Sequence, residues 1–110
     1  MRQFTPTEET ALFALTLAWC EDVHACQYLL TEAEVEAAEA MREEFEAASA
    51  TSEDPLVWAL ADVLCAYVDD VGEFDLRPER WDALEGLHAR LSVPRGHTPK
   101  RGDGTVIALR

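Results

Sequence analysis

Two Thr-x-x-Glu signatures stand directly before runs of apolar residues with helical spacing. Thr5 and Glu8 form the first signature, and Thr31 and Glu34 form the second. In such a capping box each side chain bonds to a backbone N–H of the other residue, so both signatures predict a helix start. Alternation of polar and apolar residues with period two is seen only at residues 105–109. The pattern therefore predicts an all-α chain.

Four segments have the apolar spacing of helices. We expect them at residues 6–30, 32–48, 55–71 and 78–92. Because the connections between them are short, neighbouring helices should run antiparallel. The predicted fold is a small four-helix antiparallel bundle over residues 1–93. A short basic tail rich in proline and glycine, with a strand-like end, follows over residues 94–110.

The first predicted helix is apolar on more than one side. One stripe includes Leu12, Leu15 and Trp19, and a second includes Phe13 and Leu17. A helix that is apolar nearly all round is buried. In a chain of this size it is either the central helix or a helix covered by a second copy. This pattern, together with the small side chains of the second helix, leads us to expect a homodimer.

Acidic residues outnumber basic ones by 22 to 9, giving a formal net charge of −13. Phosphate contacts need Lys and Arg, so the charge argues against direct nucleic-acid binding and against an anionic membrane surface. No apolar run approaches the roughly 20 residues that cross a bilayer. Three cysteines do not fit a disulfide framework, and no signal-peptide pattern is present, so we expect a reduced, cytoplasmic protein.

The second predicted helix carries a continuous acidic stripe, spaced four, three, four and three residues. Its members are Glu32, Glu36, Glu39, Glu43 and Glu46. Like charges at this spacing disfavour the helix by about 0.2–0.5 kcal/mol per pair. We consider two interpretations, a solvated face that keeps the protein soluble and a binding surface for a protein with a basic surface. A halophilic or GC-rich source would also produce an acidic chain with eight Arg and one Lys.

The acidity suggests two further hypotheses. Residues 32–46 carry seven Glu and one Arg, which is about one net charge per 4 Å of helix against one per ~1.7 Å in duplex DNA. The stripe alone is too dilute to imitate DNA, although the whole surface could block a nucleic-acid-binding protein in the manner of phage or anti-restriction inhibitors. Residues 94–110 carry a net charge of +3, so this tail could fold across an acidic helix.

Two Glu-x-x-His pairs raise the possibility of a metal site. Glu21 and His24 lie in the first predicted helix, and Glu85 and His88 lie in the fourth. Di-metal helical bundles use two such pairs with one more Glu from each remaining helix. The third helix offers only aspartates that point away from its core stripe, and the acidic stripe points outward. The sequence therefore favours histidines at the edge of the core and assigns no metal ligand or cofactor.

Other chemistry has less support. Cys20 could hold zinc with His24 and Cys65, but only two of these three are close in the sequence. No nucleophile elbow, phosphate-binding loop or dinucleotide fingerprint is present, and His97 belongs to no motif. We therefore predict no catalytic residue. The leading hypothesis is a small acidic, non-enzymatic protein-protein interaction or regulatory protein, and a metal-binding helical bundle is a further alternative.

Overall fold

The computed structural model describes residues 2–21, 30–69 and 77–98. They form four α-helices and one 3₁₀ turn: α1 (Pro6–Cys20), α2 (Glu32–Ser49), α3 (Pro55–Val68), α4 (Pro78–Ser92) and η2 (Val93–Arg95). These described residues contain no strand, so the predicted all-α four-helix fold is confirmed. The predicted strand-like end at residues 105–109 lies outside the described residues.

The capping signatures act as the sequence predicts. Thr5 accepts a hydrogen bond from the backbone N–H of Glu8, and the Glu8 carboxylate accepts one from the Thr5 N–H. Thr31 and Glu34 repeat this box at the start of α2. At the start of α3, the Asp54 side chain accepts from the N–H of Leu56. Three of the four helices therefore begin where a side chain satisfies an otherwise unpaired N–H.

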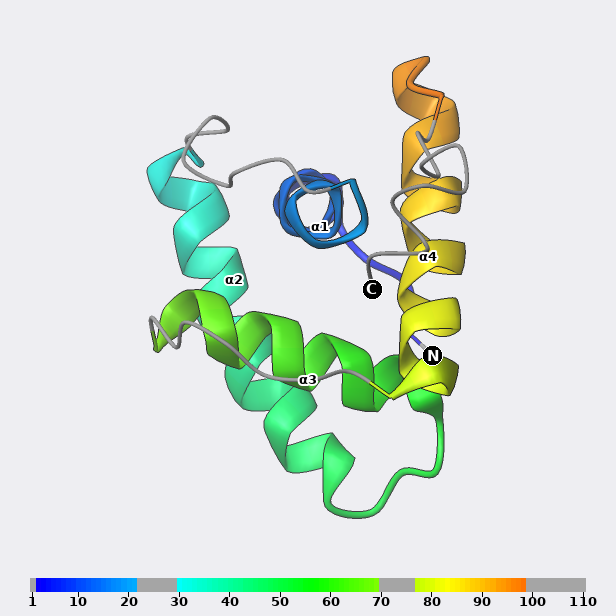
Figure 1. Ribbon diagram of the computed structural model, residues 1–110. Helices are drawn as coiled ribbons and strands as arrows, with labels where there is room; N and C mark the ends of the chain where they lie inside the picture. Colours follow the sequence, from blue (N-terminus) through cyan, green and yellow to red (C-terminus); the bar gives the residue numbers. More distant parts are fainter. Residues whose placement is uncertain (1, 22–29, 70–76, 99–110) are drawn as a thin grey trace.

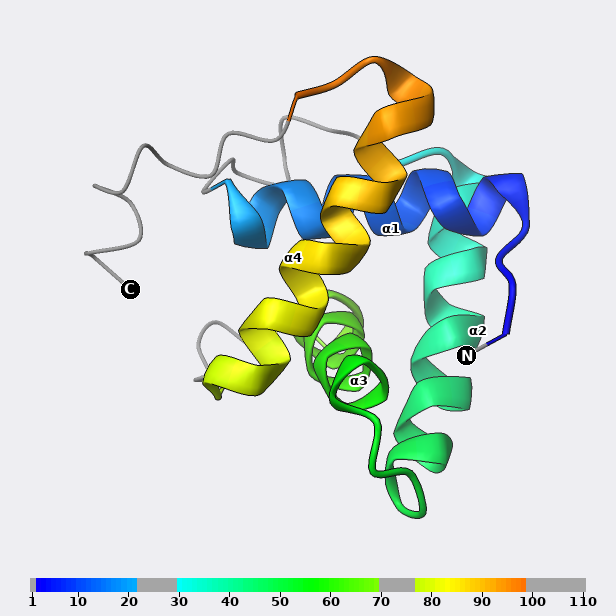
Figure 2. The ribbon, with the colours of Figure 1, turned by 90° about the vertical axis from the view of Figure 1, so that its right-hand side faces the viewer.

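Helix α1 is the central element. Figure 1 looks along its axis, with α2, α3 and α4 around it, and α1 contacts all three. Figure 2 shows α4 crossing α1. Seven of its residues are buried, and they come from both predicted apolar stripes: Ala11, Leu12, Ala14, Leu15, Thr16, Leu17 and Cys20. The single chain therefore already covers this helix, which is the first of the two arrangements expected for it.

The core lies where the inner faces of the four helices meet. Leu12, Met41, Leu60 and Leu84, one from each helix, have no exposed area. Helix α2 contributes the thinnest face, with only Ala38, Met41 and Phe45 buried. Each fully buried aliphatic side chain of this size stabilises the fold by about 1.5–3 kcal/mol. Most of the burial therefore comes from α1 and α3.

Two tryptophan clusters mark the edges of the core. The rings of Trp19 and Trp81 join α1 to α4, with their centroids 6.2 Å apart. Trp58 is 38% exposed, donates its indole N–H to the Ser52 carbonyl at 2.8 Å and lies under the Arg80 guanidinium. Trp58 thus lies over the edge of the bundle, partly exposed and fixed by these two contacts.

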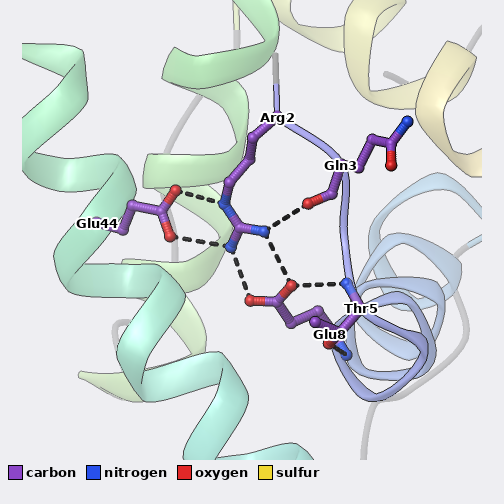
Figure 3. Close-up of polar contacts among 5 residues, drawn as sticks. All are labelled: Arg2, Gln3, Thr5, Glu8 and Glu44. Atoms are coloured by element: carbon purple, nitrogen blue, oxygen red, sulfur yellow. Dashed lines mark hydrogen bonds and ion pairs between the residues drawn. The ribbon is translucent and has the colours of Figure 1, made fainter.

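An arginine near the N-terminus joins α1 to α2, as Figure 3 shows. The Arg2 guanidinium donates two hydrogen bonds to the Glu8 carboxylate and two to the Glu44 carboxylate. It also lies 5.0 Å from the centre of the Phe4 ring. Hydrogen bonding to Arg2 lowers the pKa of Glu8 from 4.5 to about 2. Because Glu8 belongs to the capping box, one carboxylate serves both the helix start and this cluster.

Two helix ends differ from the sequence prediction. The first helix is predicted to continue to residue 30, but α1 ends at Cys20, and Glu21 leaves the helical conformation with φ −117° and ψ 11°. The third is predicted to continue to residue 71, but α3 ends at Val68, and Asp69 caps it with φ −91° and ψ 2°. The apolar spacing gives no sign of either end. The bounds of α2 and α4 agree with the prediction within one residue.

Helix length and polarity also address the membrane question. Among the helices of the described ranges, none combines the length and the apolar composition needed to cross a bilayer. This agrees with the sequence, in which no apolar run is long enough.

Candidate functional site

Three side chains that are far apart in the sequence meet beside the C-terminus of α1. Glu21 is the residue that caps α1, His88 lies on α4, and His97 follows η2. One oxygen of Glu21, Oε2, contacts Nε2 of His88 and lies 2.7 Å from Nε2 of His97. Two imidazole nitrogens thus converge on a single carboxylate oxygen. We call Glu21, His88 and His97 the carboxylate–histidine cluster.

The cluster is largely screened from solvent. The side chains of Glu21 and His88 are 4% and 2% exposed, whereas that of His97 is 28% exposed. Phe13 forms one wall, stacked on His88 at 5.7 Å and edge-on to His97 at 5.5 Å between ring centres. The Arg95 guanidinium covers the Phe13 ring at 5.0 Å. The cluster therefore has a rigid aromatic wall and an opening beside His97.

A second layer holds His88 from behind. Its Nδ1 lies 2.8 Å from the hydroxyl of Thr16, which has no exposed area, and that hydroxyl donates to the carbonyl of Phe13 at 3.1 Å. Ser92, one turn further along α4, donates its hydroxyl to the His88 carbonyl at 2.7 Å. The bond between Thr16 and the ring orients Nε2, whereas Ser92 contacts only the backbone of α4.

A Schellman turn brings His97 back onto the helices. The N–H of His97 donates to the Ser92 carbonyl, and the N–H of Gly96 donates to the Val93 carbonyl. Gly96 has the left-handed φ of 65° that this motif needs, and glycine adopts it without strain. The chain therefore reverses directly after η2. Without this reversal His97 would point away from α1.

The sequence anticipated some members of this cluster and missed another. It singled out Glu21 and His88, but as members of two separate Glu-x-x-His pairs. The structure takes one residue from each pair; Glu85 is half-buried outside the cluster, and His24 lies outside the described residues. His97 was assigned no motif. A glycine two residues after Pro94 is the signal that could have placed it, because a left-handed cap turns the next residue back toward the helix.

The three ligand atoms fit a transition-metal ion. One atom from each side chain, two imidazole nitrogens and a carboxylate oxygen, lies within 4.8 Å of the others. Two ligands on one tetrahedral zinc ion are about 3.3 Å apart, given bonds of about 2.0–2.1 Å. The Glu21 to His97 contact of 2.7 Å would therefore open by roughly 0.6 Å around an ion. The contact between Glu21 and His88 is closer, so it would have to lengthen more than the contact to His97.

The two cysteines of the described residues lie outside the cluster. Cys20 is buried and Cys65 is partly buried, both as free thiols. Burial raises the pKa of the Cys65 thiol, and the nearby Glu46 carboxylate, which accepts its S–H at 3.2 Å, raises it further. A raised pKa keeps the thiol protonated and disfavours metal binding through sulfur. The third cysteine, Cys26, lies outside the described residues.

The acidic stripe of α2 is exposed along its whole length. All five predicted members, Glu32, Glu36, Glu39, Glu43 and Glu46, lie on the solvent side of the helix. Arg42 pairs with Glu46 at 3.3 Å and with Asp69 at 2.8 Å. Among the ion pairs of the described residues, this is the one that reaches the stripe. A groove of about 380 Å³ runs between the stripe and the end of α3.

The basic tail is described only as far as residue 98. Arg95 turns toward α1, where it donates to the Thr10 hydroxyl at 3.1 Å and to the Leu91 carbonyl at 3.0 Å. This arginine does not reach the stripe on α2, and residues 99–110 lie outside the described residues.

No protein-family model, curated protein sequence or solved structure matches this chain.

Proposed function

We propose that this protein binds a divalent transition-metal ion through Glu21, His88 and His97. The observation that supports the proposal is the meeting of three ligand atoms from three separate segments around one buried point. Imidazole and carboxylate together are typical ligands of zinc and of ferrous iron. A cation would also neutralise a carboxylate that is 4% exposed and whose desolvation is otherwise costly.

The position of the cluster favours a structural role for the ion. An ion held there would connect the end of α1, the middle of α4 and the turn after η2. Helix α1 has no basic residue in its last turn, so a cation next to its C-terminal carbonyls would interact favourably with the helix dipole. The proposed role is therefore non-enzymatic, with the ion fastening the two helices that cross in Figure 2.

Native mass spectrometry and thermal unfolding test the proposal. The protein is stripped with a chelator and then titrated with zinc, ferrous iron or manganese. We expect one ion per chain, with a stabilisation of about 2.7 kcal/mol when the free ion reaches 100 times its Kd. Glu21→Gln and His97→Gln should each abolish this stabilisation.

Glu85→Gln is the matched control. It removes the carboxylate of the second Glu-x-x-His pair, which lies outside the cluster, and should leave ion binding unchanged. Loss of binding in Glu85→Gln with retention in His97→Gln would instead support sites made within each pair. If the native protein takes up none of the three ions, the contacts of the cluster are hydrogen bonds between the carboxylate and the two imidazole rings, and the proposal is wrong.

A second candidate function, the leading hypothesis from the sequence, is the docking of a basic protein on α2. The exposed stripe supports it, because all five glutamates face solvent and, within the described residues, Glu46 is the one member that forms an ion pair with an arginine. Blocking of a nucleic-acid-binding protein is the more specific form of the same proposal. Electrostatic docking of this kind weakens as salt screens the charges.

Charge reversal tests the docking surface. Glu36, Glu39 and Glu43 are changed together to Lys, and binding to a lysine-rich peptide is measured at low and high salt. The control reverses three exposed acids on other surfaces, Glu53, Glu79 and Asp82, so that the net charge of both variants is equal. Equal loss of binding in both variants would mean that net charge, and not the stripe, is responsible.

Two sequence predictions accompany this second function. We propose a homodimer in a cytoplasmic, reducing compartment. Because one chain already buries both sides of α1, a dimer would have to use another surface. Light scattering at micromolar concentration decides the oligomeric state, and a monomer would contradict this part of the proposal.

A further inference from the structure

To bind an ion, the His88 ring must leave one nitrogen bare for the metal and keep its proton on the other nitrogen. The neutral imidazole has one N–H and one bare nitrogen, and only the bare nitrogen can be a ligand. Nε2 faces Glu21 and His97, so Nε2 is the nitrogen that would bind the ion. The ring proton must then be on Nδ1, which is 2% exposed with the rest of the side chain and needs an acceptor inside the protein.

Thr16 supplies this acceptor. Its hydroxyl has a single hydrogen, which it can donate to the Phe13 carbonyl at 3.1 Å. The oxygen then has lone pairs directed at Nδ1 of His88, 2.8 Å away. When Nε2 binds an ion and Nδ1 carries the ring proton, the Nδ1–H of His88 donates to Thr16, and the Thr16 O–H donates to the Phe13 carbonyl, which can only accept.

We propose that Thr16 is a positioning residue that makes His88 a metal ligand by accepting a hydrogen bond from its Nδ1–H. The inference rests on the proposed metal-binding function and adds a residue that does not touch the ion. The bond to Thr16 holds the ring proton on Nδ1 and leaves Nε2 bare toward Glu21 and His97, where the ion would bind.

The buried surroundings make this bond important. A buried N–H that loses its acceptor costs about 1–3 kcal/mol. Outer partners of metal-bound histidines typically change metal affinity by about 10–100-fold. Thr16→Val removes the hydroxyl with little change in shape, so we expect zinc affinity to fall about 10–100-fold. Thr16→Ser keeps a hydroxyl at the same position and should restore most of the affinity.

Ser92→Ala is the matched control. Ser92 is as fully buried as Thr16, and its hydroxyl bonds to the backbone carbonyl of His88 and not to the ring. This variant should lose stability but bind zinc as the native protein does. Zinc dissociation constants are measured for all four proteins by competition with a chromogenic chelator. An equal loss of affinity in Ser92→Ala and Thr16→Val would assign the effect to general loosening of the core.

Nitrogen NMR of ¹⁵N-histidine protein gives a readout that does not depend on stability. In the zinc-loaded native protein, Nδ1 of His88 should show a directly bonded hydrogen and Nε2 should not. If Thr16→Val does not fold, this assignment in the native protein decides the proposal. A proton on Nε2 in the loaded protein, or native zinc affinity in Thr16→Val, would overturn the role of Thr16 while leaving metal binding intact. Absence of zinc binding in the native protein would overturn both.

Discussion

The Arg2 cluster allows a charge effect to be separated from a capping effect. Glu8→Gln keeps the capping box, because glutamine can also accept from the Thr5 N–H, but removes the charge that Arg2 binds. A carboxyl pKa lowered from 4.5 to about 2 corresponds to about 3.4 kcal/mol at most. The Arg2 side chain is 34% exposed, so solvent screening reduces this figure to about 1 kcal/mol.

The lowered pKa of Glu8 determines the pH range in which its pair with Arg2 stabilises the fold. Because the folded-state pKa of Glu8 is below its ordinary value, this stabilisation is complete above pH 4.5. It is lost as the pH falls toward 2. Glu8→Gln should therefore unfold more easily than the native protein at pH 7, by about 1 kcal/mol, or roughly 4 °C in Tm. The two proteins should approach each other in stability near pH 3.

Glu34→Gln provides the control for this prediction. Glu34 forms the same capping box with Thr31, but it forms no ion pair with an arginine of the described residues. Urea unfolding followed by circular dichroism at pH 7 and pH 3 gives the free energy of unfolding of all three proteins. Equal costs for Glu8→Gln and Glu34→Gln, with parallel pH dependence, would refute the assignment of the effect to Arg2.

Three other substitutions test the packing and the cluster. Leu60→Ala should cost about 2–5 kcal/mol in urea unfolding, because Leu60 has no exposed area in the centre of the core. Gly96→Ala should weaken zinc binding in the competition assay. A residue with a Cβ is strained at the left-handed φ of 65°, and relief of this strain would move the neighbouring His97. Trp58→Phe should reduce Tm by a few degrees, because it removes the hydrogen bond to Ser52 and weakens the contact of the ring with Arg80.

Local signals predicted most of the fold. Capping boxes, a proline in the first turn and apolar spacing depend on neighbouring residues, so the starts of α1 to α4 could be found from the sequence alone. The end of α1 could not. Glu21 leaves the helix where its carboxylate meets His88 and His97, 67 and 76 residues further along the chain. Periodicity carries no information about a partner at that distance.

In the candidate site, too, the sequence shows local spacing but not contacts between distant residues. Spacing identified Glu21 and His88 as residues of interest, but it paired each with a neighbour in its own helix. The structure combines them across α1 and α4 and adds His97 through a turn. Thr16 follows Leu15 within the apolar part of the first helix, where the sequence gives its hydroxyl no evident partner. Its hydroxyl becomes informative only when the ring of His88 is placed beside it.

The paired indoles of Trp19 and Trp81 give this protein a built-in optical probe. They lie across the contact between α1 and α4, the same two helices that supply Glu21 and His88. Two aromatic chromophores held this close and tilted by 53° should produce a coupled near-ultraviolet signal. A change in the crossing of the two helices would alter that signal, so occupancy of the cluster can be followed in unlabelled protein, with Trp58→Phe removing the unrelated third fluorophore.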